Sequence, residues 1–375
     1  MLQAALALLA LGEPLLFHAA PMQCYTNRHL RTLYRCCSDR VVLWTEMEKC
    51  SDLLGSAAAA RRRLHHEAVE KPNVLQLGGS DPAELARATK LGLDYGFEEI
   101  NLNCGCPSIE SGGGSFGASL MRDPEKARAC VAAMRSTGAR VSVKCRVGTR
   151  EHIDDGDDDD AALYERLARW VEAVAAAGAS HVVVHARVAV LAGASPAWNR
   201  EAPPLKPRLV ERLARDFPAL RVTTNGGLAS LDDVRAVRAP VRGAMAGRWL
   251  LQRPLDLCEV DAEPALGGGG GPGVSRAAAV RRYVRHAERE AALGTPAGEL
   301  AMPLMLVHEQ LKADGAESDE LDALERGAEA LVTDGRALSG SSSRALSKAI
   351  QSAMGKKVAN KVRRNRREAL RYWLR

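Results

Sequence analysis

The chain has 375 residues, of which 46% are hydrophobic, 26% charged and 4% aromatic. This balance is ordinary for a folded globular protein, and it excludes a wholly disordered chain and a multi-spanning membrane protein. The net charge is +6, but the last twenty residues, Lys356–Arg375, carry nine Lys and Arg against one Glu, so the rest of the chain is slightly negative. A compact basic block is typical of a segment that binds a polyanion, although a solvated terminal helix gives the same pattern.

The first segment, residues 1–16, is apolar and leads into the first predicted strand. The stretch Leu2–Phe17 has no Lys or Arg, unlike a secretory signal, and is too short to span a membrane. A remnant of an organelle-targeting segment is the alternative. The nine cysteines show no CxxC pair, which favours a reducing compartment. We therefore expect a cytoplasmic protein, or an organellar one if the segment is a targeting remnant, with no membrane contact and no bound metal.

Short apolar runs alternate with longer stretches of helical pattern. We expect eight strands, at Phe17–Ala20, Val41–Thr45, Val74–Leu77, Glu99–Leu102, Arg140–Lys144, His181–His185, Arg221–Thr224 and Gly243–Ala246. The clearest intervening helices are Asp81–Tyr95, Asp123–Thr137 and Ala161–Ala177. This alternation predicts parallel strands with crossover helices. Eight units within about 240 residues favour an α/β fold, a (β/α)8 TIM barrel, over the alternative of an open doubly wound sheet.

Polar and glycine residues follow the predicted strands, although the strands themselves are apolar. These residues are Pro21-Met22, Glu46, Gln76, Asn103–Cys106, Lys144, His185, Asn225–Gly227 and Gly247-Arg248. In a barrel, the C-terminal ends of the strands carry the active site. The pattern therefore predicts a functional site at that end.

The fourth predicted strand runs into a turn that carries a thiol. Cys106 lies between Gly105 and Pro107, which permit and fix a sharp turn. A cysteine there can act as a nucleophile, a metal ligand or a proton donor, and Cys104 points elsewhere if the turn is sharp. The stretch Gly112–Gly117 matches GxGxxG but does not directly follow a strand, so we interpret it as a mobile lid.

A glycine run divides the predicted barrel from a C-terminal region. The run Gly267–Gly273 has the composition of a flexible linker, and we place the linker at residues 261–273. The barrel is then expected to cover residues 17–260. Residues 274–375 are expected to form a helical domain that begins with an arginine-rich helix at Val274–Ala292 and ends in the basic tail.

A set of short motifs occurs in one order along the chain. They are Ala20-Pro21-Met22, Thr45-Glu46-Met47, Gln76–Asp81, Ile100–Ser108, Phe116–Met121, Val143–Gly148, His185-Ala186-Arg187, Asn199–Leu205, Thr224–Gly227 and Ala246-Gly247-Arg248. With these motifs the chain resembles the tRNA-dihydrouridine synthases, and within them the bacterial-type A branch, which modifies the D-loop of tRNA. The resemblance extends from about Phe17 to about Leu257, and a weaker one covers Arg276–Leu311.

The resemblance implies FMN on top of the barrel, NADPH or NADH as reductant, and reduction of specific D-loop uridines to 5,6-dihydrouridine. In the family the cysteine of the GCP turn is the catalytic acid, which corresponds to Cys106. An ordinary cysteine thiol, with a pKa of about 8.5, keeps its proton at neutral pH and can donate it. The residues expected to bind the cofactor are Pro21, Met22, Gln76, Lys144, His185, Asn225, Gly226, Gly227, Gly247 and Arg248. Asn103 and Arg187 are expected to bind the uridine or its phosphate. The expected partner is tRNA, bound by a monomer through the basic helix and the basic tail.

Two positions depart from the family pattern. Val188 and Ala197 stand where relatives often carry Lys. The missing charge weakens the expected contact with RNA, and the basic tail can compensate for it. Two other functions fit the same residues. A flavin barrel oxidoreductase acting on a small pyrimidine or enone would not need tRNA, and an RNA-binding relative without catalysis would lack flavin absorbance.

Overall fold

The computed structural model describes residues 14–107, 116–155, 159–315 and 324. The chain forms two compact units that interleave along the sequence. Of the described residues, those within 14–28, 40–249 and 263–270 form the barrel unit, and those within 29–39, 250–262 and 271–324 form the helical unit.

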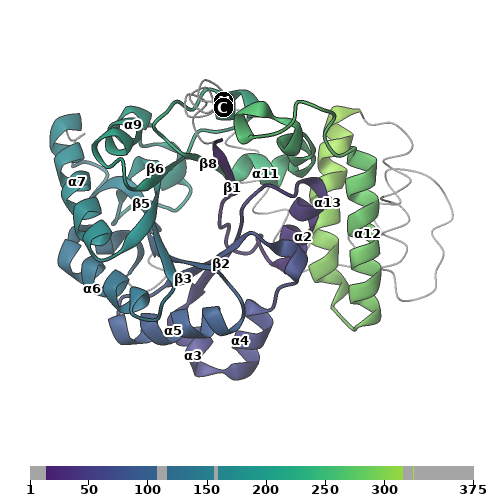
Figure 1. Cartoon of the computed structure of the whole chain (residues 1–375), viewed down its shortest axis with the longest axis horizontal. Helices are drawn as coiled ribbons and strands as arrows, with labels where there is room; N and C mark the ends of the chain where they lie inside the picture. Colours follow the sequence, from purple (N-terminus) through teal and green to yellow (C-terminus); the bar gives the residue numbers. More distant parts are fainter. Residues whose placement is uncertain (1–13, 108–115, 156–158, 316–323, 325–375) are drawn as a thin grey trace, which may run out of the picture. The chain divides into compact units, whose positions relative to one another are not determined.

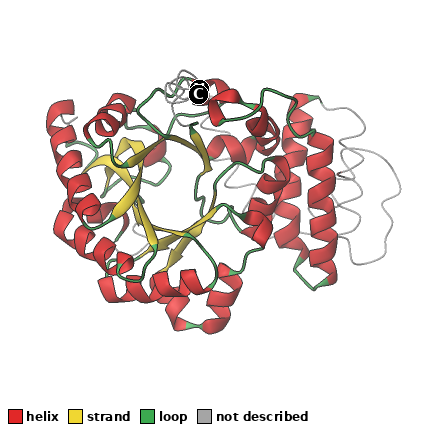
Figure 2. Ribbon diagram, in the orientation of Figure 1, coloured by secondary structure: helices red, strands yellow, loops and turns green. Residues whose placement is uncertain are grey.

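Eight parallel strands build the barrel unit, and each overlaps one of the eight predicted strands. They are β1 (Leu16–Ala19), β2 (Leu43–Lys49), β3 (Asn73–Gly78), β4 (Glu99–Cys104), β5 (Arg140–Arg150), β6 (Ala179–Val190), β7 (Arg221–Asn225) and β8 (Gly243–Ala246). Their order in the sheet is β1-β8-β7-β6-β5-β4-β3-β2. The two edges meet where the Val42 N–H donates to the Phe17 carbonyl at 2.9 Å and the Ala19 N–H donates to the Val42 carbonyl at 3.0 Å. The strands form a nearly closed ring (Figures 1 and 2), so the TIM barrel is confirmed.

Helices surround the ring of strands. Those of the barrel unit are α3 (Cys50–Gly55), α4 (Ala57–Leu64), η1 (Ala68–Glu70), α5 (Pro82–Asp94), η3 (Gly117–Arg122), α6 (Pro124–Arg135), α7 (Asp160–Ala176), α8 (Trp198–Glu201), α9 (Pro207–Asp216), α10 (Leu231–Arg235) and η5 (Pro264–Leu266), and α11 (Arg248–Gln252) begins in it. Helix α5 begins where the sequence predicts, because the Asp81 carboxylate accepts from the Glu84 N–H at 2.8 Å, just ahead of Pro82. Asp123 caps α6 in the same way.

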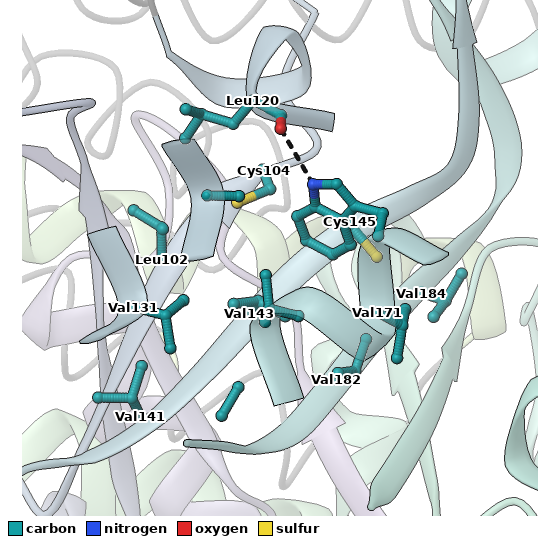
Figure 3. Close-up of a cluster of buried hydrophobic side chains, with 14 of the residues drawn as sticks. Leu102, Cys104, Leu120, Val131, Val141, Val143, Cys145, Val171, Val182 and Val184 are labelled. Carbon is teal, nitrogen blue, oxygen red and sulfur yellow. Dashed lines mark hydrogen bonds between the residues drawn. The ribbon is translucent and has the colours of Figure 1, made fainter. Parts of the chain in front are cut away.

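Alternation along the strands gives the barrel wall two different faces. The outward residues pack against the helices in a buried apolar layer (Figure 3), which includes Leu102, Cys104, Val141, Val143, Cys145, Val182 and Val184. Trp170 of α7 belongs to this layer and donates from Nε1 to the Leu120 carbonyl of η3 at 3.0 Å (dashed line in Figure 3). Each fully buried side chain of this kind contributes about 1.5–3 kcal/mol to folding. The opposite, inward face is rich in polar residues: Glu99, Asn101, Asn103, Ser142, Lys144, Arg146, His181 and His185.

The helical unit contains α2 (Arg28–Cys37), η4 (Pro254–Ala262), α12 (Arg276–Ala292) and α13 (Ala297–Asp314). Helix α12 confirms the helix predicted at Val274–Ala292. It begins after Ser275, whose hydroxyl accepts from the Ala278 N–H at 3.2 Å. The Tyr283 hydroxyl of α12 donates to the Leu300 carbonyl of α13 at 2.9 Å, which holds the two helices together.

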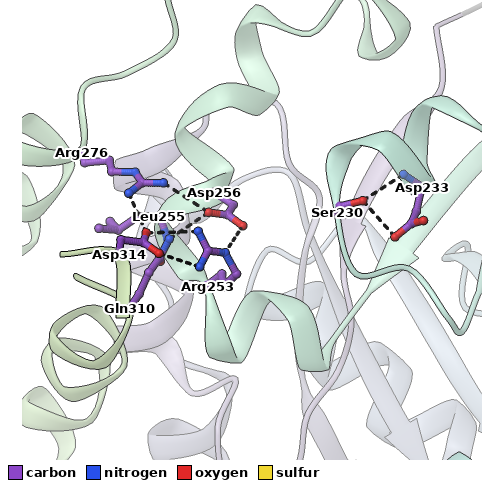
Figure 4. Close-up of polar contacts among 8 residues, drawn as sticks. All are labelled: Ser230, Asp233, Arg253, Leu255, Asp256, Arg276, Gln310 and Asp314. Atoms are coloured by element: carbon purple, nitrogen blue, oxygen red, sulfur yellow. Dashed lines mark hydrogen bonds and ion pairs between the residues drawn. The ribbon is translucent and has the colours of Figure 1, made fainter. Parts of the chain in front are cut away.

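An ion-pair network joins the elements of the helical unit (Figure 4). Arg253 donates to both carboxylate oxygens of Asp314, at 2.8 and 3.1 Å, and Arg276 donates to the same carboxylate at 2.9 Å. Asp256 pairs with Arg253 at 2.8 Å and accepts from Gln310 at 2.8 Å. The network connects η4 to both α12 and α13. The figure also draws Ser230, the N-cap of α10 in the barrel unit, with Asp233.

Some predicted features lie outside the described residues. They are most of the apolar first segment, the lid as far as residue 115, and the basic tail. No helix in the described part of the chain is long and apolar enough to cross a membrane. The domain limits predicted at residues 16, 260 and 273 stay predictions.

Candidate active site

The C-terminal ends of the strands, here called the barrel mouth, hold every residue that the sequence predicts for the site. Gln76 lies on β3, Asn103 on β4, Lys144 on β5, His185 and Arg187 on β6 and Asn225 on β7, while Pro21, Met22, Cys106, Gly226, Gly227, Gly247 and Arg248 lie just after β1, β4, β7 and β8. Parallel register sets them at similar heights. Asn103 pairs with Lys144 across β4 and β5, and His185 pairs with Asn225 across β6 and β7.

The turn that carries Cys106 is fixed from two sides. The Asn103 Oδ1 atom accepts from the backbone N–H groups of Gly105 at 3.1 Å and Cys106 at 3.0 Å. The Ala118 N–H donates to the Cys106 carbonyl at 2.9 Å. Gly117 makes this approach possible, because its φ is +72° and an added Cβ would lie 2.5 Å from the Cys106 carbonyl oxygen. The half-buried thiol of Cys106 is therefore held in a defined place, whereas Cys104 faces the outer apolar layer, as the sharp turn predicts.

Arg146 is a second support of this turn, and the sequence-based prediction gave it no role. Its Nε donates to the Gly105 carbonyl at 3.1 Å and its Nη1 donates to the Asn199 carbonyl at 2.8 Å. The residue is 4% exposed. Hydrogen bonds from a charged donor contribute about 1.5–3 kcal/mol each. Its position two residues after Lys144 on β5 was the available signal, since alternation puts both on the inner face.

The inner face of β5 and β6 is electrostatically positive. Burial, and then the Arg146 charge, lowers the pKa of Lys144 to about 8. Burial, followed by Arg146 and other nearby cations, holds the pKa of His185 well below its usual range. Lys144 therefore keeps its charge at neutral pH, while His185 is a neutral imidazole that can donate or accept one hydrogen bond.

Three arginines surround the outer edge of the barrel mouth. Arg248 donates to the Glu201 carboxylate at 2.9 Å and to the Arg200 carbonyl at 3.5 Å. Arg187 donates to the Pro203 carbonyl. The buried Nε of Arg187 has no hydrogen-bond partner among the residues that the structure describes. Arg200 and Glu201 lie on α8, and like Arg146 they had no role in the sequence-based prediction. The excess of cations over the Glu201 charge suits an anionic ligand such as a phosphate.

Two glycines let the backbone at the barrel mouth pack closely against neighbouring side chains. Gly226 has a φ of +103°, and an added Cβ would lie 2.5 Å from Cδ2 of His185. A Cβ at Gly247 would lie 2.9 Å from the Met22 sulfur. Backbone N–H groups after the seventh and eighth strands of a barrel often bind phosphate. Any residue larger than glycine at position 226 would displace the imidazole.

The remaining predicted residues are placed less directly. Asn225 donates from Nδ2 to the Met245 carbonyl at 2.8 Å, so this amide holds β7 to β8. Pro21 joins the site only through its position just after β1. Gln76 hydrogen-bonds Asn103 at 2.9 Å, which brings a predicted cofactor residue and a predicted substrate residue into contact. Their roles stay predictions.

Comparison with known proteins gives a consistent result. A sequence model described as dihydrouridine synthase (Dus) matches residues 18–284. A protein of Xanthomonas axonopodis pv. citri (strain 306) named tRNA-dihydrouridine(20/20a) synthase is 45% identical over 244 residues, which are 65% of this chain and 70% of that protein. A protein of Escherichia coli (strain K12) with the same name is 39% identical over 290 residues, 77% of this chain and 80% of the other. The matched region contains the whole barrel mouth from Pro21 to Arg248.

Proposed function

This chain belongs to the dihydrouridine synthase family, and from that premise we propose how its barrel mouth reduces uridine in tRNA to 5,6-dihydrouridine. The reaction is flavin-dependent and saturates the C5–C6 bond of the uracil by adding one hydride and one proton. Relatives are named for positions 20 and 20a of tRNA, and we assign the same D-loop uridines to this chain. The specific cofactor is FMN, with NADPH or NADH as the reductant.

The residues at the barrel mouth suit the phosphate of FMN. The cations there exceed the charge of Glu201, and the buried Nε of Arg187 has no hydrogen-bond partner among the described residues. Arg248 and the N–H groups of Gly226 and Gly227 follow β7 and β8, where barrels hold phosphates. The ring and ribityl positions would be lined by the remaining predicted cofactor residues, which are Pro21, Met22, Gln76, Lys144, His185, Asn225 and Gly247. Lys144 would stabilise negative charge there, because it remains protonated below about pH 8.

The chemistry divides between the cofactor and the protein. When bound, FMN would supply the hydride for C6 of the uracil. The Cys106 thiol donates the proton that C5 receives, and the fixed turn around Cys106 keeps its Sγ in one place while this happens. Asn103 and Arg187 position the uridine. A base in folded tRNA must leave its stack to reach them, which costs a few kcal/mol.

The observation that carries this proposal is the Cys106 turn, held by Asn103, Arg146 and Ala118 at the edge of a cationic barrel mouth. The test is to incubate purified protein and NADPH with unmodified tRNA and to measure dihydrouridine by nucleoside mass spectrometry. We expect a yellow protein that binds FMN and forms dihydrouridine at position 20 or 20a.

Three outcomes would contradict the proposal. Protein that binds no flavin after purification and reconstitution would indicate an RNA-binding relative without catalysis. Reduction of free uridine or an enone as fast as tRNA would indicate a small-molecule oxidoreductase. Dihydrouridine confined to positions outside the D-loop would leave the reaction intact but contradict the assignment of the substrate site.

A further inference from the structure

A row of buried polar side chains runs along the inside of the barrel to the Cys106 turn. Gln76, Asn101 and Ser142 are register partners across β3, β4 and β5. Each is at most 1% exposed. Asn103 lies on the same face of β4, two residues nearer the barrel mouth. The row therefore connects the middle of the barrel with the predicted catalytic turn.

The hydrogen bonds of this row form one continuous chain. Asn101 Nδ2 donates to Ser142 Oγ at 3.0 Å, and Gln76 Nε2 donates to Asn101 Oδ1 at 2.9 Å. Asn103 Nδ2 donates to Gln76 Oε1 at 2.9 Å, and the Cys106 N–H donates to Asn103 Oδ1 at 3.0 Å. Every amide oxygen in the chain accepts and every amide nitrogen donates, so the dipoles all point the same way.

The upper end of the chain imposes this direction. The backbone N–H groups of Gly105 and Cys106 can only donate, so Asn103 Oδ1 faces them and Asn103 Nδ2 faces Gln76. The lower end agrees with it. Burial opposes a charge on Glu99, but the hydrogen bond and the electrostatic interaction with His181, and a smaller contribution from the Ser142 hydroxyl, lower the pKa of Glu99 to about 2. A hydroxyl that favours an ionised carboxylate turns its hydrogen toward it, which leaves the Ser142 oxygen to accept from Asn101.

This direction determines what the amides of Gln76 and Asn103 offer to a ligand. Each oxygen is already used within the row, whereas each NH2 group has a second hydrogen. The Asn103 oxygen is occupied by two N–H groups of the Cys106 turn and the Gln76 oxygen accepts from Asn103, so the second hydrogen of each NH2 group is what the two side chains can supply to a ligand. A group bound against Asn103 must therefore present an acceptor, and Gln76 can donate to an acceptor in the same way.

We propose that Asn101, Ser142 and Glu99 are positioning residues, which fix the amides of Gln76 and Asn103 as hydrogen-bond donors toward the ligand and hold the Cys106 turn. This inference rests on the proposed function for the identity of the acceptors, which are carbonyl oxygens or an unprotonated ring nitrogen of the flavin or the uracil. The positioning role itself is independent of that identity. The three residues act through Gln76 and Asn103 and make no contact of their own with the ligand in this proposal.

The substitution Asn101→Asp tests the direction of the chain. A protonated aspartic acid can donate to Ser142 and accept from Gln76, so it restores the chain. An ionised one only accepts and breaks it. Burial and the nearby Glu99 charge raise the pKa of the new carboxyl. We therefore expect the rate of tRNA uridine reduction by the flavin-loaded variant, divided by the wild-type rate, to fall about tenfold or more between about pH 5 and about pH 8.

Asn73→Asp is the matched control. Asn73 is also buried and lies on β3, but at the opposite end of the strand and outside the chain. We expect its rate ratio to stay flat over the same pH range. The charged and titratable groups near position 101 are Glu99, His18, His181 and Arg140 toward the base of the barrel, and Lys144 toward the mouth. Their contributions are common to wild type and control, so the ratio removes them.

A second measurement needs no activity. In flavin-free protein, Asn101→Leu and Ser142→Ala should each speed hydrogen exchange at the Gly105 and Cys106 amides, Asn101→Leu by about tenfold, while Asn73→Asp should leave both rates unchanged. A flat pH ratio for Asn101→Asp together with unchanged exchange would overturn the proposal. If the exchange pattern holds while wild-type protein binds no flavin or reduces no tRNA, the proposed function fails and the positioning role stands.

Discussion

The barrel contains two polar clusters that differ in how their charges are balanced. At its base, the Glu99 carboxylate accepts from His181 at 3.0 Å and lies 3.4 Å from the Arg140 guanidinium. These partners balance its negative charge. His181 in turn bonds Thr223 at 2.8 Å. At the barrel mouth, several cations lie near His185, and Glu201 is the main carboxylate that balances their charge.

The difference indicates what each cluster contributes. In the base cluster the protein itself supplies the partners of the buried charge, so the cluster stabilises the fold. In the mouth cluster, burial lowers the pKa values of Lys144, Arg146 and His185, and nearby like charges lower them further. The folded state therefore disfavours the charged forms of these residues. Such an imbalance is typical of a site whose missing partner is a ligand. Removing a charge should therefore destabilise the fold in the base cluster and stabilise it in the mouth cluster.

The largest effect is expected at Cys106 in the mouth. Cys106→Ala removes the proton donor and should slow uridine reduction by about 10²-fold or more, with FMN still bound. Single-turnover rates of the flavin-loaded variant measure this. The control is Cys104→Ala, two residues away but in the outer apolar layer. It should lower stability through a small cavity and leave the rate unchanged. Equal rates for Cys106→Ala and wild type would remove the thiol from the mechanism.

The sequence predicted the mouth better than the base. Alternation on β4 was enough to place Asn103 beside the Cys106 turn, and the motif order supplied the chemistry. The partners of Asn101 were not predictable, because they depend on how β3 and β5 are shifted against β4. A one-residue shift of either strand would replace Gln76 or Ser142 with an apolar neighbour. Arg146 escaped notice for the same reason, since its acceptors lie on other elements.

The next effect concerns the base cluster. Glu99 has a folded-state pKa of about 2, below its usual value of about 4.3. Its charge therefore stabilises the fold above about pH 4.3, and that stabilisation is lost as the pH falls toward 2. Glu99→Gln should cost up to about 3 kcal/mol of unfolding free energy at pH 7. Urea denaturation at a series of pH values should show wild type and variant converging below about pH 4.

Glu98→Gln is the control for that measurement. Glu98 is adjacent in the sequence, but it is exposed and pairs with Lys71 at 3.2 Å. A surface ion pair contributes about 0–1 kcal/mol, so this variant should differ little from wild type at any pH. If both substitutions cost the same, the base cluster would have no special role in stability.

Removing the charge of Lys144 should raise stability, in contrast to removing that of Glu99. Its folded-state pKa of about 8 lies below the usual value of about 10.4, so the unfolded chain binds more protons between these values. Wild-type stability should rise with pH in that window. Lys144→Met removes the cost of the buried charge and should stabilise flavin-free protein by about 1–3 kcal/mol at pH 7. Its advantage should vanish by about pH 10.5. Lys126→Met, at an exposed position on α6, should change stability little, and a loss of stability in Lys144→Met would contradict the charge imbalance.

The smallest effect is expected at Arg200, on the outer edge of the mouth. The residue is exposed, and its charge is repelled by Arg248 and attracted by Glu201. A cation in that position suits an RNA phosphate, and removing one such contact lowers the slope of log affinity against log salt by about 1. Arg200→Ala should therefore weaken tRNA binding several-fold at low salt and progressively less at high salt, with the FMN affinity unchanged. Arg169→Ala on α7, an exposed arginine that bonds the Glu165 carbonyl, should leave the slope as in wild type. If the two variants behave alike, the phosphate contact lies elsewhere and the cations of the mouth serve the flavin alone.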